Sequence, residues 1–250
     1  MKDKEKIAVV GLGEVGRPIL ELVSRHHESL GVDITPVEPA GSVDVLHICY
    51  PFHIHNFVAE TVRYIDLFRP TLTVINSTVA IGTTRHIAER AGSAVVNSPV
   101  RGKHAHMVDD LLLYTKFVGA MDPSAGAKAV AHFASVGLKT KLLSSPEATE
   151  LAKLTETTYF GLMIAWAQEV ERYCDHLGED YDEVTSFYEE IKFFPPVKYF
   201  PGIIGGHCVM PNIEILKKFA PSEILSAIQA SNKRKLEREA LSQDDVVSVA

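Results

Sequence analysis

The sequence predicts an α/β fold in which a doubly wound parallel sheet, residues 1–145, precedes an all-helical C-terminal domain, residues 146–241. Two observations lead to this prediction. Up to residue 145, short apolar segments of the kind buried in parallel sheets alternate with amphipathic helical segments. From Pro146 onward only the helical pattern remains. A chain of 250 residues is long enough for two modest domains.

Seven strands are expected in the sheet domain, and the first is the fully apolar segment Ile7-Ala8-Val9-Val10. We expect the strands at residues 7–10, 30–34, 43–50, 72–77, 94–97, 115–120 and 139–143. Helices are expected between them at about residues 17–27, 56–67 and 124–136, and from Gly82 onward. Such alternation produces parallel sheets with helices on both faces.

Pro146 and Glu147 are expected to open the first helix of the second domain, because proline suits the first helical turn and acidic side chains favour the N-terminal end. This helix should run to His176 and stop at Gly178. Further helices are expected at about residues 181–192, 212–219 and 222–241, with a loop at 193–208 and a flexible tail at 242–250.

The composition argues against several classes of protein. A net charge of −7 does not suit a nucleic-acid partner. No apolar run approaches the roughly 20 residues of a membrane span, and the charged segment Met1–Lys6 does not resemble a secretory signal. Three widely spaced cysteines form neither a disulfide framework nor a zinc motif. We therefore expect a cytoplasmic protein that acts on a small molecule, away from membranes.

A glycine-rich loop, Gly11-Leu12-Gly13-Glu14-Val15-Gly16, follows the first strand and opens the first helix. This context is typical of the dinucleotide-binding turn of a Rossmann-type sheet. In such a turn Gly11 permits the bend, Gly13 lets the backbone approach a pyrophosphate, and Gly16 lets helix and strand pack closely. The helix start adds N–H groups and partial positive charge.

Asp33 stands 22 residues after Gly11, at the expected end of the second strand. A carboxylate there accepts hydrogen bonds from both ribose hydroxyls and repels the 2′-phosphate of NADP, so the expected cofactor is NAD. Glu38 is a weaker candidate for this role. S-adenosylmethionine enzymes use similar turns, and a purely structural turn with a surface acid is a further alternative.

The segment Gly205-Gly206-His207-Cys208 places a cysteine directly after two glycines, which let a backbone approach a ligand. A cysteine in such a turn can act as a nucleophile when its thiolate is stabilised. Packing is expected for the other two cysteines, because Cys49 lies in a predicted strand and Cys174 on a predicted helix.

Six segments, in order along nearly the whole chain, resemble the UDP-glucose/GDP-mannose dehydrogenase family. They are residues 9–16, 32–34, 48–51, 76–84, 150–154 and 201–208. The first two resemble the family's cofactor loop and ribose-binding segment, and the last closely resembles its catalytic cysteine loop. The resemblance supports NAD and adds Tyr50, Pro51, Ser77 and Thr78 to the residues expected at the cofactor.

The resemblance also implies a reaction. In that family the cysteine attacks an aldehyde intermediate to give a thiohemiacetal, a second hydride transfer gives a thioester, and water hydrolyses it. Cys208 would be the nucleophile, and Lys153 would stabilise the developing oxyanion. The structural alternatives are a packing cysteine and a solvated lysine.

The chain departs from the family pattern. Thr157 replaces an asparagine and Asn212 replaces an aspartate, so we expect these two residues to line the site by hydrogen bonding only. Pro99-Val100-Arg101 lacks the glutamate of the family's Pro-Glu-Arg turn. Only ten residues separate Asp33 from Asp44, so the sheet should lack one strand and leave the second strand at an edge. The family's sugar-nucleotide-binding domain has no counterpart here, which favours a smaller substrate or an altered reaction.

Histidines and cations gather in the loops after the third and fifth predicted strands, where open α/β sheets bind ligands. We expect an anionic substrate, such as a carboxylate or phosphate, to be bound by His53, Arg101, Lys103, His104 and His207. Surface histidines without a role are an equal alternative, and a metal site that includes the neighbouring His55 and His106 is a third.

These features predict an NAD-dependent oxidoreductase that oxidises an alcohol or aldehyde of a small, anionic substrate, with Cys208 at the reacting carbon. A homodimer is expected through the apolar helix at residues 148–173. Two alternatives stay open: an S-adenosylmethionine-dependent methyltransferase and a non-catalytic nucleotide-binding protein.

Overall fold

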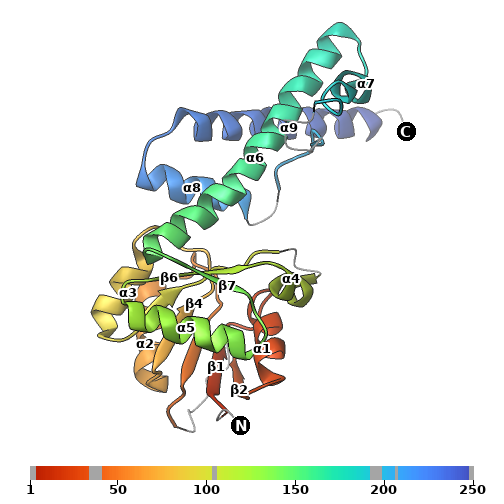
Figure 1. The fold of residues 1–250 in the computed structure, drawn as a ribbon. Coiled ribbons are helices and arrows are strands. Elements are labelled where there is room, and N and C mark those ends of the chain that lie inside the picture. Colours follow the sequence, from red (N-terminus) through yellow and green to blue (C-terminus); the bar gives the residue numbers. More distant parts are fainter. Residues whose placement is uncertain (1–3, 34–40, 103–105, 192–198, 206–207, 248–250) are drawn as a thin grey trace. The chain divides into compact units, whose positions relative to one another are not determined.

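The computed structural model describes residues 4–33, 41–102, 106–191, 199–205 and 208–247. It forms two compact units, Met1–Lys153 and Leu154–Ala250, and each is described by itself (Figure 1). The boundary between them lies inside the long helix α6, Pro146–Leu177. The first two turns of this helix therefore belong to the first unit.

The described part of the first unit contains one seven-stranded sheet with the order β2-β1-β3-β4-β5-β6-β7. Its strands are β1 Lys6–Val10, β2 Glu28–Val32, β3 Val45–Ile48, β4 Leu72–Ile75, β5 Val95–Asn97, β6 Lys116–Ala120 and β7 Thr140–Leu143. Each lies where an apolar segment predicts a strand. β2 lies at an edge, as the short distance between Asp33 and Asp44 predicts. The Rossmann-type α/β fold is thus confirmed.

The sheet is not parallel throughout, which corrects the prediction, because β6 runs antiparallel to β5. A parallel neighbour needs a connection that crosses to the opposite end of the sheet, whereas an antiparallel neighbour needs one that stays at the same end. The connection here contains a helix absent from the sequence prediction, α4 Met107–Leu113. Only Met107 and Leu111 of this helix are buried, so its apolar repeat is too short to stand out.

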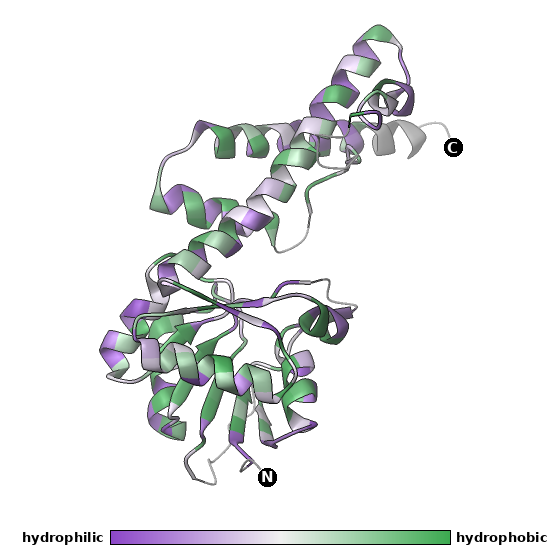
Figure 2. Cartoon of the chain, in the orientation of Figure 1, coloured by the Kyte–Doolittle hydropathy of each residue, from purple (hydrophilic) through white to green (hydrophobic). Residues whose placement is uncertain are grey.

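Helices cover both faces of the sheet, and the strands between them are strongly apolar (Figure 2). The remaining helices of this unit are α1 Gly16–Ser24, α2 Phe57–Phe68, α3 Thr83–Ala91 and α5 Pro123–Ser135. Ile19 of α1, Met107 of α4 and Phe133 of α5 belong to the core on one face. Phe68 of α2 and Ile87 of α3 belong to the core on the other.

The second unit is helical in most of its described residues. Besides the rest of α6 it contains α7 Tyr181–Ser186, α8 Val209–Phe219 and α9 Glu223–Val247. α7 ends earlier than residue 192, because the chain continues as three-residue turns such as that from Thr185 O to Tyr188 N. α8 begins before residue 212, since Pro211 is tolerated in a first turn. α9 enters the expected tail, because neither glycine nor proline follows Leu241. Among the described helices, none has the length and apolar character to span a membrane.

A chain of hydrogen bonds leads from the core of the first unit to the partly exposed Glu5. His47 of β3 is fully buried, with its Nδ1 3.0 Å from Nδ2 of Asn76 and its Nε2 3.0 Å from Nε2 of His132. The Nδ1 of His132 in turn lies 2.6 Å from Oε2 of Glu5. The Asn76 amide nitrogen can only donate, so His47 must accept at Nδ1 and donate at Nε2. A neutral His47 therefore satisfies both of its ring nitrogens.

The pKa of His47 lies well below its ordinary value, first because of burial and then because of the positive charges that His132 and Lys116 can carry. A histidine whose folded pKa is depressed contributes stability above its unfolded pKa, about 6.5, and this stability is lost as the pH falls toward the folded pKa. The free energy of unfolding should therefore fall below about pH 6.5, by up to about 1.4 kcal/mol per pH unit from this group.

We predict that His47→Leu flattens this slope, although it lowers stability at neutral pH. The measurement is chemical denaturation between about pH 5 and about pH 8, a range that histidine titration covers. Val45→Ala, which truncates a buried neighbour on the same strand and face, is the matched control and should keep the wild-type slope. Equal slopes in wild type and His47→Leu would contradict the prediction.

Candidate functional site

The order of the strands places a topological switch point at the carboxyl ends of the parallel strands. β1 lies between β2 and β3. The connection from β1 to β2 therefore runs toward one edge of the sheet, and the connection from β2 to β3 returns past β1 toward the other edge. In open α/β sheets, ligands bind outside the strand ends at such a switch point. The glycine loop follows β1, Tyr50 and Pro51 follow β3, and Ser77 and Thr78 follow β4. The fold thus brings these predicted cofactor residues to one edge of the sheet.

Close approaches that need glycine shape the glycine loop. Gly11 has a φ of 90°, and a Cβ at this position would lie 2.6 Å from the backbone nitrogen of Tyr50. A Cβ on Gly16 would lie 1.8 Å from the carbonyl oxygen of Gly11. Gly13 differs, because it is exposed and no described atom beyond its chain neighbours lies within 4 Å of where its Cβ would be. The loop is therefore open at Gly13.

The residue predicted to bind the ribose lies beside this loop. The backbone nitrogen of Gly11 donates to the carbonyl oxygen of Val32 at 2.8 Å, which brings the next residue, the exposed Asp33, next to the loop. Glu38, the weaker candidate, lies outside the described residues.

The start of α1 fits an anionic group. Nε of Arg17 donates to the carbonyl oxygen of Leu12 at 2.6 Å and so holds the loop from the helix side. Val15 is the N-cap residue, Glu14 precedes it and is exposed, and no side chain caps the helix. An uncapped helix start leaves N–H groups for an anion. The residues present therefore fit a pyrophosphate at Gly13 and ribose hydroxyls at Asp33.

The side chains of Tyr50 and Ser77 are occupied by contacts within the protein. Tyr50 is buried, its hydroxyl lies 2.6 Å from Oγ1 of Thr61, and burial raises its pKa. Oγ of Ser77 donates to the carbonyl oxygen of Tyr50 at 2.6 Å. The side chains of these two residues are therefore engaged within the protein, and they are followed by the exposed Pro51 and the half-buried Thr78.

Glu150 holds the turn after β4, a role that the sequence does not reveal. Its carboxylate accepts hydrogen bonds from the backbone nitrogens of Gly82 at 2.6 Å and Thr84 at 2.9 Å. α3 begins in this turn without a cap from its own N-cap residue. Burial raises the pKa of Glu150, and the donors at Thr84 and Gly82 oppose that rise. Because these donors lie far away in the sequence, no local pattern could indicate the contact.

Lys116 is a second residue that the sequence does not single out. It is almost fully buried, and its Nζ donates to the carbonyl oxygen of Ser98 at 2.7 Å. Burial lowers its pKa to about 7, Cys49 opposes this shift, and the positive charge of Lys153 adds to it. Lys153 therefore lies within electrostatic reach of a buried amine.

The packing role predicted for two cysteines is confirmed. Cys49 and Cys174 are both buried, and burial raises the pKa of Cys49 to about 12, so this thiol stays protonated.

In the second unit, the predicted catalytic residues Thr157 and Asn212 are brought together. Nδ2 of Asn212 donates to Oγ1 of Thr157 at 2.7 Å, and this hydroxyl donates to the carbonyl oxygen of Leu154 at 3.1 Å. Cys208 is exposed and is the N-cap residue of α8. The thiol thus stands at the start of the helix whose first turn carries Asn212. Gly206 and His207 lie outside the described residues.

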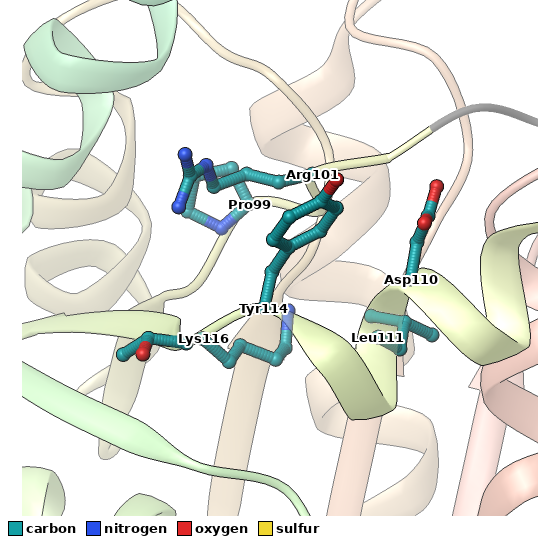
Figure 3. A pocket seen from close by; sticks show the side chains of 7 residues that line it. Pro99, Arg101, Asp110, Leu111, Tyr114 and Lys116 are labelled. Carbon is teal, nitrogen blue, oxygen red and sulfur yellow. The ribbon is translucent and has the colours of Figure 1, made fainter.

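A small pocket lies beside Arg101 (Figure 3). It is lined by Pro99, Arg101, Asp110, Leu111, Tyr114, Thr115 and Lys116. The guanidinium carbon of Arg101 lies 5.8 Å from the ring centre of Tyr114 and 5.5 Å from that of Phe117. In this view the guanidinium and the Asp110 carboxylate lie on opposite sides of the Tyr114 ring. Aromatic contacts of this kind attract a guanidinium group.

The structure only partly tests the predicted group of histidines. His53, His55 and His106 are exposed, whereas Lys103, His104 and His207 lie outside the described residues. Within the residues that the structure does describe, no three histidine, cysteine, aspartate or glutamate side chains are arranged to hold a metal ion.

Residues 147–234 match the model of the UDP-glucose/GDP-mannose dehydrogenase family, central domain. Over these residues the chain resembles this family. The NDP-N-acetyl-D-galactosaminuronic acid dehydrogenase of Ralstonia nicotianae is 24% identical over 270 residues, which cover 83% of this chain and 63% of that protein. The UDP-N-acetyl-D-mannosamine dehydrogenase of Methanococcus maripaludis is 24% identical over 259 residues, which cover 83% and 60%. The chain thus spans about three fifths of the length of these relatives.

Solved structures show the same fold. The UDP-D-ManNAc dehydrogenase of Pyrococcus horikoshii has a TM-score of 0.81 at 20% identity, over 96% of this chain and 72% of that one. The 3-hydroxyisobutyrate dehydrogenase of Mycobacterium tuberculosis has a TM-score of 0.71 at 18% identity, over 92% and 94%. A Rossmann-type sheet followed by helices is therefore shared by dehydrogenases with differently named substrates.

Two glutamates on the first turns of α6 give a matched test of the turn after β4. Glu150→Gln keeps the size of the side chain but leaves one of the two buried N–H groups without its charged acceptor, so we predict a loss of about 1 to 3 kcal/mol in the free energy of unfolding. Glu147 pairs with Arg85 at the surface, and Glu147→Gln should cost less than about 1 kcal/mol. Denaturant titrations of both variants measure the difference, and equal losses would refute the role of Glu150.

Proposed function

We propose that this chain forms the catalytic part of an NAD-dependent oxidoreductase that oxidises an alcohol or aldehyde group of an anionic substrate. The observation that carries the proposal is the glycine loop at the switch point of the sheet. A Cβ at Gly11 or Gly16 would clash with neighbouring atoms, whereas a Cβ at Gly13 would meet no described atom beyond its chain neighbours. The relatives, which are named as nucleotide-sugar dehydrogenases, support the same class of reaction.

Bound NAD would supply the acceptor for a hydride from the substrate carbon. The chain's own residues would hold it: the N–H groups around Gly13 would face the pyrophosphate, and Asp33 would accept hydrogen bonds from the ribose hydroxyls. Oxidation of an alcohol then releases the hydroxyl proton and leaves a carbonyl group. The side chain of Asp33 would also exclude a 2′-phosphate, which makes NAD rather than NADP the cofactor.

The roles of Cys208 and Lys153 follow from the resemblance and form part of this proposal. The thiol of Cys208 adds to an aldehyde carbon, so that an S–C bond forms and the carbonyl oxygen takes up a proton. The ammonium of Lys153 stabilises the negative charge that develops on that oxygen. Thr157 and Asn212 bind polar groups of the substrate or water, because neither a hydroxyl nor an amide can serve as a general base near neutral pH.

The anionic part of the substrate is assigned to Arg101. Its guanidinium is held over two aromatic rings, which fixes its direction at the small pocket after β5. A planar guanidinium can form paired hydrogen bonds with a carboxylate or a phosphate.

Free thiols at all three cysteines support the cytoplasmic setting expected from the composition.

A homodimer through α6 is also part of the proposal. Beyond residue 154, five large exposed side chains of this helix recur at intervals of three, four or seven residues: Tyr159, Leu162, Trp166, Tyr173 and Leu177. Such spacing places them along one side of the helix and suits the helix of a second copy.

Gly13→Ala tests the proposed cofactor site. A methyl group at this position meets no described neighbour, so Gly13→Ala should leave the thermal midpoint of unfolding nearly unchanged. It should nevertheless raise the Kd for NAD about tenfold or more, because the methyl group occupies the space of the pyrophosphate. Gly11→Ala is the contrasting control and should lower the midpoint, since its φ is positive and Tyr50 lies too close. Unchanged NAD affinity in Gly13→Ala would count against the proposed cofactor site.

The second prediction concerns Cys208. Cys208→Ser should reduce the rate of NADH formation from an aldehyde by more than about a hundredfold, because serine is a much weaker nucleophile at neutral pH. Cys174→Ala, which alters a buried cysteine of the same unit, should keep most of the activity. The aldehydes that correspond to UDP-N-acetylmannosamine, UDP-glucose and small hydroxy acids are the substrates to compare by the absorbance of NADH. Full activity in Cys208→Ser would remove the cysteine from the mechanism.

The third prediction concerns assembly. Trp166 is 56% exposed on α6, and Trp166→Glu places a charge in the proposed interface, so the variant should sediment as a monomer. Leu236→Glu changes a similarly exposed side chain, 46%, on α9 and should sediment like the wild type. The proposal requires that the wild type sediments as a dimer, and a monomeric wild type would overturn it.

A further inference from the structure

We propose that Asn232, together with Gln168, positions the segment that leads to Cys208, and that the rate of the reaction depends on this contact. The inference rests on the proposed role of Cys208, although the contact itself can be tested without any activity. All the residues involved belong to the second unit.

Asn232 of α9 pairs with both backbone groups of one residue. Its Oδ1 accepts a hydrogen bond from the backbone nitrogen of Ile204 at 2.7 Å, and its Nδ2 donates to the carbonyl oxygen of Ile204 at 3.1 Å. Both residues are 3% exposed. An amide has a donor and an acceptor side by side, so it can satisfy an irregular stretch of backbone in the way a neighbouring strand would. Aspartate, leucine and alanine lack this pair of groups.

Gln168 of α6 holds the same segment two residues earlier. Its Nε2 donates to the carbonyl oxygen of Gly202 at 2.6 Å, and its Oε1 accepts from Oγ of Ser231 at 2.8 Å. Gln168 is fully buried. The backbone from Gly202 to Ile204 is thus tied to two helices by side chains that have little freedom to move. Buried amides are costly unless they are paired, and apolar side chains would join the two helices at a lower desolvation cost.

The chain is anchored again on the other side of Cys208. Val209 is buried against α6, where a Cβ on Gly161 would lie 2.5 Å from Cγ1 of Val209. Asn212 is hydrogen-bonded to Thr157 one turn later. Cys208 therefore follows Ile204 by four residues and stands directly before a second fixed point.

A thiol held between two anchors stays at one place relative to Thr157 and Asn212. A misplacement of about 1 Å at a reacting group can reduce a rate about a hundredfold. Release of the anchor at Ile204 would therefore lower kcat and leave the cofactor's affinity unchanged, since the glycine loop belongs to the first unit. Asn232 is in this sense a positioning residue, because it acts on Cys208 through the backbone.

The test compares Asn232→Ala, Asn232→Asp and Lys233→Ala in the full chain. Lys233 is the next residue on α9, is strongly exposed and pairs only loosely with Glu237, at 3.7 Å, so Lys233→Ala is the matched control. Asn232→Asp keeps the acceptor for the Ile204 N–H group and loses the donor, and it serves if Asn232→Ala does not fold. Hydrogen exchange of the peptide that contains Ile204 and Cys208 measures how firmly the segment is held. The kcat for aldehyde oxidation and the Kd for NAD measure the functional effect.

We expect exchange in this peptide to become about tenfold faster or more in both Asn232 variants, kcat to fall at least tenfold, and the Kd for NAD to stay the same, with no change in Lys233→Ala. Unchanged exchange overturns the inference, and so does faster exchange with unchanged kcat. If the wild type oxidises no aldehyde, the proposed function fails, and the exchange data alone still decide whether Asn232 holds the segment.

Discussion

The first unit depends on one close backbone contact, between Gly11 and Tyr50. No side chain fits between the loop after β1 and the end of β3, and the φ of 90° at Gly11 turns the chain toward α1. This contact joins the two strands on either side of the switch point. Gly16 then packs against Gly11, and the hydrogen bond from Gly11 to Val32 brings Asp33 alongside. Close backbone contacts at Gly11 and Gly16 thus shape the loop, whereas the Cβ position of Gly13 has no described neighbour.

A second constraint acts on the loops after β3 and β4, at the same end of the sheet. Ser77 donates to the carbonyl oxygen of Tyr50, and Glu150 accepts from the turn that begins α3. Ser77 therefore ties the loop after β4 to the end of β3, and Glu150 ties the turn before α3 to α6. Rigidity of this kind suits a site that must hold a cofactor in one orientation.

Much of the first unit could be predicted from the sequence, because each buried strand is a short apolar run and each glycine of the loop has a local reason. The direction of β6 could not be predicted, since strand direction depends on where a connection ends and not on local apolarity. Helix α4 was not predicted because its apolar repeat is too short to recognise. Glu150 and Lys116 escaped because their partners lie in other elements, whereas Thr157 and Asn212 were found only through the resemblance, being 55 residues apart. Asn232 is similar, as its partner Ile204 lies 28 residues earlier.

The proposed reaction requires that the glycine loop binds a dinucleotide. The most direct measurement is a calorimetric titration of the full chain with NAD and, separately, with S-adenosylmethionine. We predict a saturable NAD isotherm with a Kd of about 1 to 100 μM, near the range of ordinary enzyme ligands, and no binding of S-adenosylmethionine at the same concentrations. Binding of S-adenosylmethionine without NAD would contradict it, as would the absence of NAD binding to folded protein.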